Sequence, residues 1–328
     1  MPAVSITHPE KVLFPESGIT KGELCAYYES VAPLMLPHVR GRPVTMERYP
    51  AGVGRQGFIQ KDVVKGFPAW LERVEVQRRD AKADGAVHYP LANDARALVW
   101  MANQNSVTPH VWTSRLPHLD KPDLCVIDLD PSDDDPGALR AAVLAVRALF
   151  DELGLSSFVK TSGSKGYHVV VPLDGGDDAA AVWRFGHGAG AVLVKRHPDM
   201  FTQEFIKADR KGRIFVDTGR NAPGATFAAV YAVRPKPEAP VSAPCTWDEI
   251  ERAEAGPRTF TLRNLPARLA TAGDLWREMD AARRSLRAPM AALDGMLTEQ
   301  DWQEAHAAST RRPVSRKSPR SRETRHRS

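Results

Sequence analysis

The stretch that most constrains the fold is residues 157–173, SFVKTSGSKGYHVVVPL, which reads as strand, Gly-rich turn and strand. Two strands joined by so short a turn pair antiparallel with each other. A second apolar run, LCVIDLD at 124–130, is bounded by prolines and predicts a buried strand that ends in acids. Further strands are predicted for GRIFVD (212–217) and ATFAAVYAV (225–233), and the region around 213–233 resembles a second hairpin.

Helices alternate with these strands. Residues 21–36 predict a helix because apolar side chains recur at helical spacing after Thr20, a residue type that favours the N-cap. Residues 136–153 predict an amphipathic helix with Pro136 in its first turn and Gly154 just beyond its end. Other helices are expected at 94–104, 178–197, 246–254 and 274–287, and strands with turns at 43–60. This order predicts an α+β fold with a mostly antiparallel sheet.

The length and composition predict a globular protein. The chain has 328 residues, of which 42% are hydrophobic, so it can bury one large core or two small ones. No apolar run is long enough for a transmembrane helix, and the start MPAVSITHPEKVLF lacks the basic and apolar blocks of a secretory signal. Cys25, Cys125 and Cys245 form no CxxC pair, which argues against a zinc ribbon or a disulfide scaffold. We therefore expect a reduced, cytoplasmic protein.

The net charge of +5 is unevenly placed along the chain. Residues 111–194 hold 7 basic and 12 acidic side chains, whereas residues 195–236 hold 9 and 4. Acids that bind metal beside bases that bind phosphate would give this pattern, and so would chance patchiness of a solvated surface. Residues 311–328 hold eight Lys and Arg and one acid among many Ser and Pro. We expect this segment to be disordered, and either to bind nucleic acid or to solubilise the chain.

Three acids are candidate metal ligands. Asp128 and Asp130 are two residues apart in a predicted strand, so both carboxylates project from one face and repel unless a cation lies between them. Their oxygen ligands suit Mg²⁺ or Mn²⁺, although such a pair also arises by chance. Asp217 ends another predicted strand and would complete two adjacent metal sites of the kind used in phosphoryl transfer. Alternatively, Asp217 is an ordinary turn former and the nearby Arg220 an ordinary surface cation.

The Gly-rich turn carries candidate phosphate ligands. Ser162, Ser164 and Lys165 offer hydroxyls, turned backbone amides and a positive charge, as a phosphate site requires, although the turn is not a Walker A loop. An ordinary Gly-Ser hairpin is the alternative. His168 starts the following strand and could donate to a triphosphate oxygen or assist proton transfer.

Five segments occur in collinear order: HPEKVLFPESGITKGELCAYYESVAPLMLPHVRGRPVTMERYP, DLDP, KTSGSKGYHVVVPL, GRIFVDTGRNAPGAT and VRPKPEAPVSAPCTWDEI. Over residues 5–290 they resemble the polymerase domain of bacterial ligase D, which belongs to the archaeo-eukaryotic primase superfamily. The resemblance implies a primase-polymerase fold, with an RRM-like catalytic sheet packed against an N-terminal α/β region. It places a catalytic domain at 1–300, with an N-terminal region to about 115 and a catalytic core at about 116–290, before a basic tail at 305–328.

The resemblance also assigns roles to individual residues. It implies that Asp128, Asp130 and Asp217 hold two Mn²⁺ or Mg²⁺ ions. The expected nucleotide ligands are Ser162, Ser164, Lys165, His168, Arg220 and His110. It implies that Lys11 and Lys21 bind the 5′-phosphate of a DNA gap or end, and that Phe58 stacks on the template. Three features depart from the family pattern: Ile59 where a second Phe is common, NSVTPHVW at 105–112 around His110, and the Gly-rich GHGAG at 186–190.

The implied activity is template-directed addition of NTPs or dNTPs to 3′ ends at DNA gaps and double-strand breaks, in non-homologous end joining. Lys82-Ala83-Asp84-Gly85 spells the KxDG of a ligase adenylation site, but no Arg follows in the required position. We therefore expect a nucleoid-associated polymerase domain that recruits Ku and a separate ligase, and no membrane. The alternatives are a primase that starts chains without a primer and a non-catalytic module that bridges DNA ends.

Overall fold

The computed structural model describes residues 4–63, 66–78 and 85–310. Its central element is a six-stranded sheet in the order β11-β12-β8-β10-β9-β16, in which all neighbours pair antiparallel except β11 and β12. The expected α+β fold with a mostly antiparallel catalytic sheet is therefore confirmed. The strands are β8 (Leu124–Asp130), β9 (Phe158–Thr161), β10 (Tyr167–Pro172), β11 (Phe201–Thr202), β12 (Ile214–Asp217) and β16 (Pro244–Cys245).

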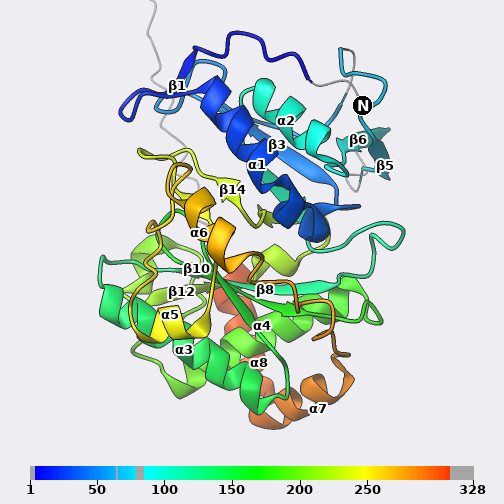
Figure 1. Cartoon of the computed structure of the whole chain (residues 1–328). Helices are drawn as coiled ribbons and strands as arrows, with labels where there is room; N and C mark the ends of the chain where they lie inside the picture. Colours follow the sequence, from blue (N-terminus) through cyan, green and yellow to red (C-terminus); the bar gives the residue numbers. More distant parts are fainter. Residues whose placement is uncertain (1–3, 64–65, 79–84, 311–328) are drawn as a thin grey trace, which may run out of the picture.

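A second sheet of four strands, in the order β13-β7-β3-β4, belongs to the N-terminal part of the molecule. Figure 1 shows helices α1 and α2 beside it, at the opposite end of the molecule from α3, α4 and α8. Its strands are β3 (Val44–Arg48), β4 (Phe58–Gln60), β7 (Ser106–Trp112) and β13 (Thr226–Ala228). Three small two-stranded sheets pair β1 (Val12–Phe14) with β2 (Ile19–Thr20), β5 (Arg73–Gln77) with β6 (Ala86–Pro90), and β14 (Ala232–Val233) with β15 (Val241–Ser242).

Local signals set the helix starts. Thr20 caps α1 (Lys21–Val39), as the sequence predicts, and Glu23 completes a capping box. Asp135 caps α3, which begins at Pro136 and is followed by Gly154 at a positive φ of 71°. The helices are α2 (Ala95–Asn103), α3 (Pro136–Glu152), α4 (Ala179–Arg196), α5 (Trp247–Glu251), α6 (Leu265–Ala272), α7 (Arg287–Met296) and α8 (Glu299–Thr310), with short 3₁₀ helices at Lys207–Arg210 and Gly219–Asn221. No helix in the described part of the chain is long and apolar enough to cross a membrane.

Glycines of α4 lie where the Cβ of any other residue would collide with a neighbouring side chain. A Cβ on Gly186 would lie 2.7 Å from the Nδ2 of Asn221, and one on Gly190 would lie 2.4 Å from the Nε2 of Gln203. The helix therefore approaches the sheet and its connections more closely than any residue larger than glycine allows. The Gly-rich run is a packing feature of an unbroken helix.

A buried ion pair joins the two sheets. Arg42, which follows α1, donates to both carboxylate oxygens of Asp123 at 2.6 and 2.9 Å, and both residues are almost fully buried. Arg115 and Arg283 also contact Asp123. Because a buried carboxylate needs its partners, this cluster fixes the N-terminal part against the catalytic sheet.

Three sequence predictions are wrong. Residues 213–233 do not form a hairpin, because β12 pairs with β8 whereas β13 pairs with β7 of the other sheet. Residues 274–287 form turns, and the next helix begins only at Arg287. The basic tail was expected from 305, but residues up to Thr310 belong to α8. The KxDG residues Lys82, Ala83 and Asp84, and the basic residues 311–328, lie outside the described residues.

Candidate active site

The register of the catalytic sheet places four chemical groups in one row. Asp217 of β12 pairs with Asp128 of β8, which pairs with His168 of β10, which in turn pairs with Lys160 of β9. Paired residues of neighbouring strands point to the same face of a sheet, and Asp130 joins that face two residues along β8. The carboxylate oxygens of Asp128, Asp130 and Asp217 lie within 4.8 Å of one another.

The carboxylates repel one another in this arrangement. Burial, together with Asp128 and Asp217, raises the pKa of Asp130 to about 6. Burial also raises the pKa of Asp217, although Arg220 opposes this. Oxygen-rich, closely spaced and mutually repelling carboxylates are the donor set that a hard divalent cation requires. The three residues therefore form a site that could hold metal.

Arg220 and His168 flank the central carboxylate. The Nε of Arg220 lies 3.2 Å from Asp128 and its Nη2 lies 3.2 Å from Asp217. The Nε2 of His168 lies 3.3 Å from the other oxygen of Asp128. Burial would raise the pKa of Asp128, but His168 and Arg220 hold it well below its usual range. Burial and the neighbouring Lys160 lower the pKa of His168 to about 4, so the imidazole is neutral at pH 7.

Asn221 fixes the position of Arg220. Its side-chain oxygen accepts from the backbone N–H of Val126 at 2.7 Å, and its Nδ2 donates to the carbonyl of Val126 at 2.7 Å. This side-chain amide is fully buried and bonds the backbone of Val126 as a neighbouring strand would. It therefore holds the 3₁₀ turn that contains Arg220 against β8.

The Gly-rich turn between β9 and β10 is shaped from within. The hydroxyl of Ser162 accepts from the backbone N–H groups of Ser164 and Gly166, each at 3.1 Å. A Cβ on Gly166 would lie 1.7 Å from the carbonyl oxygen of Leu129, so only glycine permits this approach to β8. Ser162 therefore forms the turn, while the exposed Lys165 is available to a ligand.

A cavity of about 520 Å³ opens beside this turn. Ser164 and Lys165 line it together with Pro131, which directly follows Asp130, and with Arg258. The Nε of Arg258 donates to the carbonyl of Ser164 at 2.6 Å and braces the turn. Two of the predicted phosphate ligands, Ser164 and Lys165, thus line a hollow that begins at the residue after Asp130.

Residues of the second sheet reach toward the same region. The Nε2 of His110 on β7 lies 3.1 Å from the carboxylate of Glu47. Burial lowers the pKa of His110, and the nearby Arg234 and Arg220 lower it further, although Glu47 opposes this. The Cγ of Arg234 lies only 2.5 Å from the position that a Cβ on Gly163 would take. The Nε of Arg234 is buried and finds no hydrogen-bond partner among the described residues.

The two predicted DNA-end lysines lie near each other. Lys21 donates to the hydroxyl of Thr7 at 3.0 Å and is almost fully buried, whereas the ammonium of Lys11 contacts the carbonyl of Pro50. Burial lowers the pKa of Lys21, and the nearby Lys11 lowers it further. Two adjacent ammonium groups favour an anion beside them.

Phe58 is exposed, with 47% of its surface accessible, and the guanidinium of Arg48 lies 5.3 Å from its ring. Ile59, its neighbour on β4, is 59% exposed. A large exposed apolar pair on an edge strand is unusual unless it contacts a partner.

The sequence alone missed Lys160, Arg234, Glu47 and Asn221. Only the cross-strand register reveals Lys160, which is fully buried and whose ammonium donates to the hydroxyl of Ser242. Arg234 lies in the VRPKP segment, so the resemblance marked the segment without the residue. No local pattern marks Glu47 or Asn221, because their roles depend on contacts with distant strands.

Clustered carboxylates on a mostly antiparallel sheet, beside a Gly-rich turn, match the primase-polymerase class of folds. The chain belongs to the family of LigD primase-polymerase domains, whose model matches residues 20–276. It is 35% identical over 281 residues to the multifunctional non-homologous end joining protein LigD of Mycolicibacterium smegmatis, covering 85% of this chain and 36% of that protein. The bifunctional LigD of Bacillus subtilis is 27% identical over 274 residues, covering 83% of this chain and 43% of that protein.

A solved structure shows the same fold. The polymerase domain of Mycobacterium tuberculosis ligase D, in complex with DNA, matches with a TM-score of 0.79 and 33% identity. The match covers 85% of this chain and 99% of that domain. The matched part of the chain spans nearly all of that solved domain, and the chain spans between a third and a half of the curated relatives that it matches.

Proposed function

We propose that this protein adds NTPs or dNTPs to the 3′ ends of primers at DNA gaps and double-strand-break ends, directed by a template strand. The observation that carries the proposal is the row of Asp217, Asp128 and His168 across three strands, with the Gly-rich turn at its edge. The names of the relatives and the DNA in the similar solved structure support a role in end joining, on DNA of the nucleoid.

The carboxylates would hold two divalent ions, Mn²⁺ or Mg²⁺. Bound there, these ions supply the charge that activates the primer hydroxyl and stabilises the leaving pyrophosphate. Asp128, Asp130 and Asp217 together would supply the oxygen ligands for these ions.

The remaining side chains position the nucleotide. Lys165 and the backbone amides of its turn bind the triphosphate, and Arg220 moves from the carboxylates to phosphate oxygens when nucleotide arrives. His168 is neutral and donates one hydrogen bond to a phosphate oxygen without adding charge to the row. His110 of the second sheet and Arg234, which follows β14, approach the nucleotide from the same side.

The same proposal assigns the DNA end to the N-terminal part. Lys11 and Lys21 bind the 5′-phosphate across the gap, and Phe58 stacks on the template base at that end. These contacts are independent of base sequence, as repair of arbitrary ends requires. Ku would bring the protein to breaks, and a separate ligase would seal the product.

The test is primer extension on three substrates: a gapped duplex with a 5′-phosphate, a recessed duplex, and a template without primer. Each is offered NTPs or dNTPs with Mn²⁺. Extension of gapped and recessed DNA, fastest at the gap, supports the proposal. Product on the primerless template would instead identify a primase, and DNA binding without any extension would identify an end-bridging module.

A further inference from the structure

Glu47 and His110 share one face of the second sheet. Strands β3 and β7 pair antiparallel with Glu47 opposite Thr108 and Thr45 opposite His110, so these four side chains point to the same side. The Nε2 of His110 lies 3.1 Å from one carboxylate oxygen of Glu47. The hydroxyl of Tyr49 donates to the other oxygen at 2.7 Å. Both oxygens of Glu47 therefore have a partner, and its carboxylate is held in place.

These contacts fix which nitrogen of His110 carries the ring proton. Burial would raise the pKa of Glu47, but the hydrogen bonds from His110 and Tyr49 lower it to about 2, so the group is ionised and only accepts hydrogen bonds. Burial lowers the pKa of His110, so above pH 7 its ring is neutral and has one proton. That proton lies on Nε2, which contacts Glu47, and Nδ1 is left as a hydrogen-bond acceptor.

Nδ1 is the polar atom that His110 offers to a ligand. It has no hydrogen-bond partner among the described residues, and the side chain is 19% exposed. Arg220, which contacts the carboxylates, and Arg234 are close enough to lower the pKa of His110. Thr108 donates to the carbonyl of Val233 at 2.7 Å, which holds the segment of Arg234 against the same face. The acceptor therefore lies in the region where the nucleotide is proposed to bind.

A hydrogen-bond acceptor at this position selects among the groups of a nucleotide. The phosphate oxygens are acceptors themselves and offer no proton to Nδ1. The N–H groups of the base differ among the four bases, and template-directed addition has to accept each base in turn. The sugar hydroxyls are the donors that all four nucleotides share. This step rests on the proposed nucleotide addition.

We propose that His110 accepts a hydrogen bond from a sugar hydroxyl of the incoming nucleotide through Nδ1, and that Glu47 is the positioning residue that makes the ring an acceptor. His110 then contacts the sugar, while Lys165 and Arg220 hold the triphosphate. The hydroxyl is either the 2′ group of an NTP or the 3′ group that NTPs and dNTPs share. Nucleotides that lack one or the other separate the two.

The tautomer is tested in the free protein, without metal or nucleotide, by NMR of the ring nitrogens at pH 8. The spectrum of His110→Asn identifies the signals of His110. The wild-type ring should show a proton on Nε2 and none on Nδ1. In Glu47→Gln, whose amide can accept or donate, the two tautomers should mix. A ring proton on Nδ1 of the wild-type protein would overturn the proposal, whether or not the protein extends primers.

The hydroxyl is tested by adding one nucleotide to a gapped primer with Mn²⁺ at pH 8, using ATP, 2′-deoxy-ATP or 3′-deoxy-ATP. In the wild-type protein, loss of the recognised hydroxyl should lower kcat/KM by about 5-fold, the contribution of one hydrogen bond. This penalty should disappear in His110→Leu and shrink in Glu47→Gln. It should persist in part in His110→Asn, which keeps an acceptor near the place of Nδ1.

Two results of the same assay would contradict the hydroxyl contact. One is a wild-type protein that uses all three nucleotides equally well. The other is a His110→Leu protein whose kcat/KM falls by the same factor for all three, because this would indicate that His110 binds phosphate. Failure of every protein to extend the primer would refute the proposed function instead. The hydroxyl comparison is then made on nucleotide affinity, measured by calorimetry.

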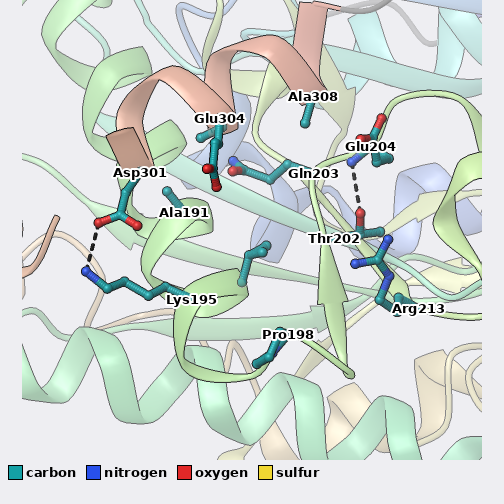
Figure 2. Close-up of a pocket in the computed structure, with 12 residues that line it drawn as sticks. Ala191, Lys195, Pro198, Thr202, Gln203, Glu204, Arg213, Asp301, Glu304 and Ala308 are labelled. Carbon is teal, nitrogen blue, oxygen red and sulfur yellow. Dashed lines mark hydrogen bonds and ion pairs between the residues drawn. The ribbon is translucent and has the colours of Figure 1, made fainter. Parts of the chain in front are cut away.

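Glu304→Gln is the matched control, because it removes the same charge by the same substitution. Glu304 of α8 is exposed and accepts from the Nε2 of Gln300 at 2.8 Å. Figure 2 shows it at a cavity of about 420 Å³ between α4 and α8, which Lys195 and Asp301 also line as an ion pair. This variant should leave the tautomer of His110 and the hydroxyl penalty unchanged. A change as large as that in Glu47→Gln would overturn the role of Glu47.

Discussion

Single buried charges in this protein are placed by contacts far apart in the sequence. Lys21 begins α1, yet its ammonium lies between Thr7 and the carbonyl of Asn103, close to Lys11. A lysine that gives up most of its hydration needs an anion or several acceptors to remain charged. The pair is therefore better suited to a bound phosphate than to a free surface.

Replacing Lys11 by Ala together with Lys21 by Met should weaken binding of gapped DNA that bears a 5′-phosphate by about 10-fold or more, because two charge-assisted contacts are lost. Methionine keeps the buried stem of Lys21 packed. Anisotropy with 5′-phosphate and 5′-hydroxyl gaps measures the effect, and Lys61→Ala, an exposed lysine after β4, is the matched control. A loss of the same size on 5′-hydroxyl DNA would contradict the phosphate site.

His187 gives a prediction about pH. Its ring stacks on Trp183 with centroids 5.0 Å apart, and its Nε2 has no hydrogen-bond partner among the described residues. Burial, and then His306, lower the pKa of His187 to about 4. The unfolded chain, in which the histidine pKa is near 6.5, binds a proton at His187 more readily than the folded chain does. The contribution of neutral His187 to the free energy of unfolding is therefore complete above pH 6.5 and is lost as the pH falls toward 4.

Between pH 7 and pH 4.5 the wild-type protein should therefore lose about 2 kcal/mol more free energy of unfolding than His187→Phe, which keeps the aromatic stack. Urea unfolding at the two pH values measures the difference. Identical pH dependence in the two proteins would show that His187 takes up its proton freely in the folded state.

At the scale of elements, α4 and the 3₁₀ turn of Arg220 depend on each other. Gly186 lets the helix approach Asn221, and Asn221 binds the backbone of β8 two residues before Asp128. Packing on one side of the sheet thus fixes the arginine that contacts carboxylates on the other side.

Gly186→Ala should lower the free energy of unfolding by roughly 1–3 kcal/mol, because a Cβ would stand 2.7 Å from a buried amide that cannot move without breaking its hydrogen bonds. The control is Gly295→Ala in α7, where a Cβ would meet nothing within 4 Å. There alanine should stabilise the helix by up to about 1 kcal/mol. Both changes are measured by urea denaturation, and equal effects would show that the close approach of α4 is not limiting.

Elements with local signals were predictable. The hairpin at 157–173, the strand of Asp128 and Asp130, and the start of α1 follow from a Gly-rich turn, an apolar run bounded by prolines, and an N-cap residue. Residues 274–287 were not, because Asp274 accepts from the Nε2–H of His38, the hydroxyl of Tyr231 and the N–H of Trp276, and these tertiary contacts hold a turn where apolar spacing suggests a helix.

The whole molecule brings the site together from two sheets. The chain passes from β12 in one sheet to β13 in the other, where β13 pairs with β7, the strand of His110, and Arg234 follows shortly after. No sequence period reports such a switch between sheets. The carboxylate triad could be predicted because Asp130 and Asp217 end two strands, and Asp128 shares a face with Asp130 two residues away on the same strand. Lys160 and Arg234 could not be predicted, since the position of Lys160 depends on the register of β9 against β10 and that of Arg234 on how distant segments pack.

The most direct test of the account is Mn²⁺-dependent addition of one complementary nucleotide to a gapped primer, by the wild-type protein, Asp128→Asn and Asp199→Asn. Asp199 is an exposed acid in the turn after α4 and serves as the control. The account predicts that Asp128→Asn slows addition by about 10³-fold or more while binding DNA like the wild-type protein, and that Asp199→Asn changes neither. Addition by Asp128→Asn at the wild-type rate would contradict the assignment of the active site.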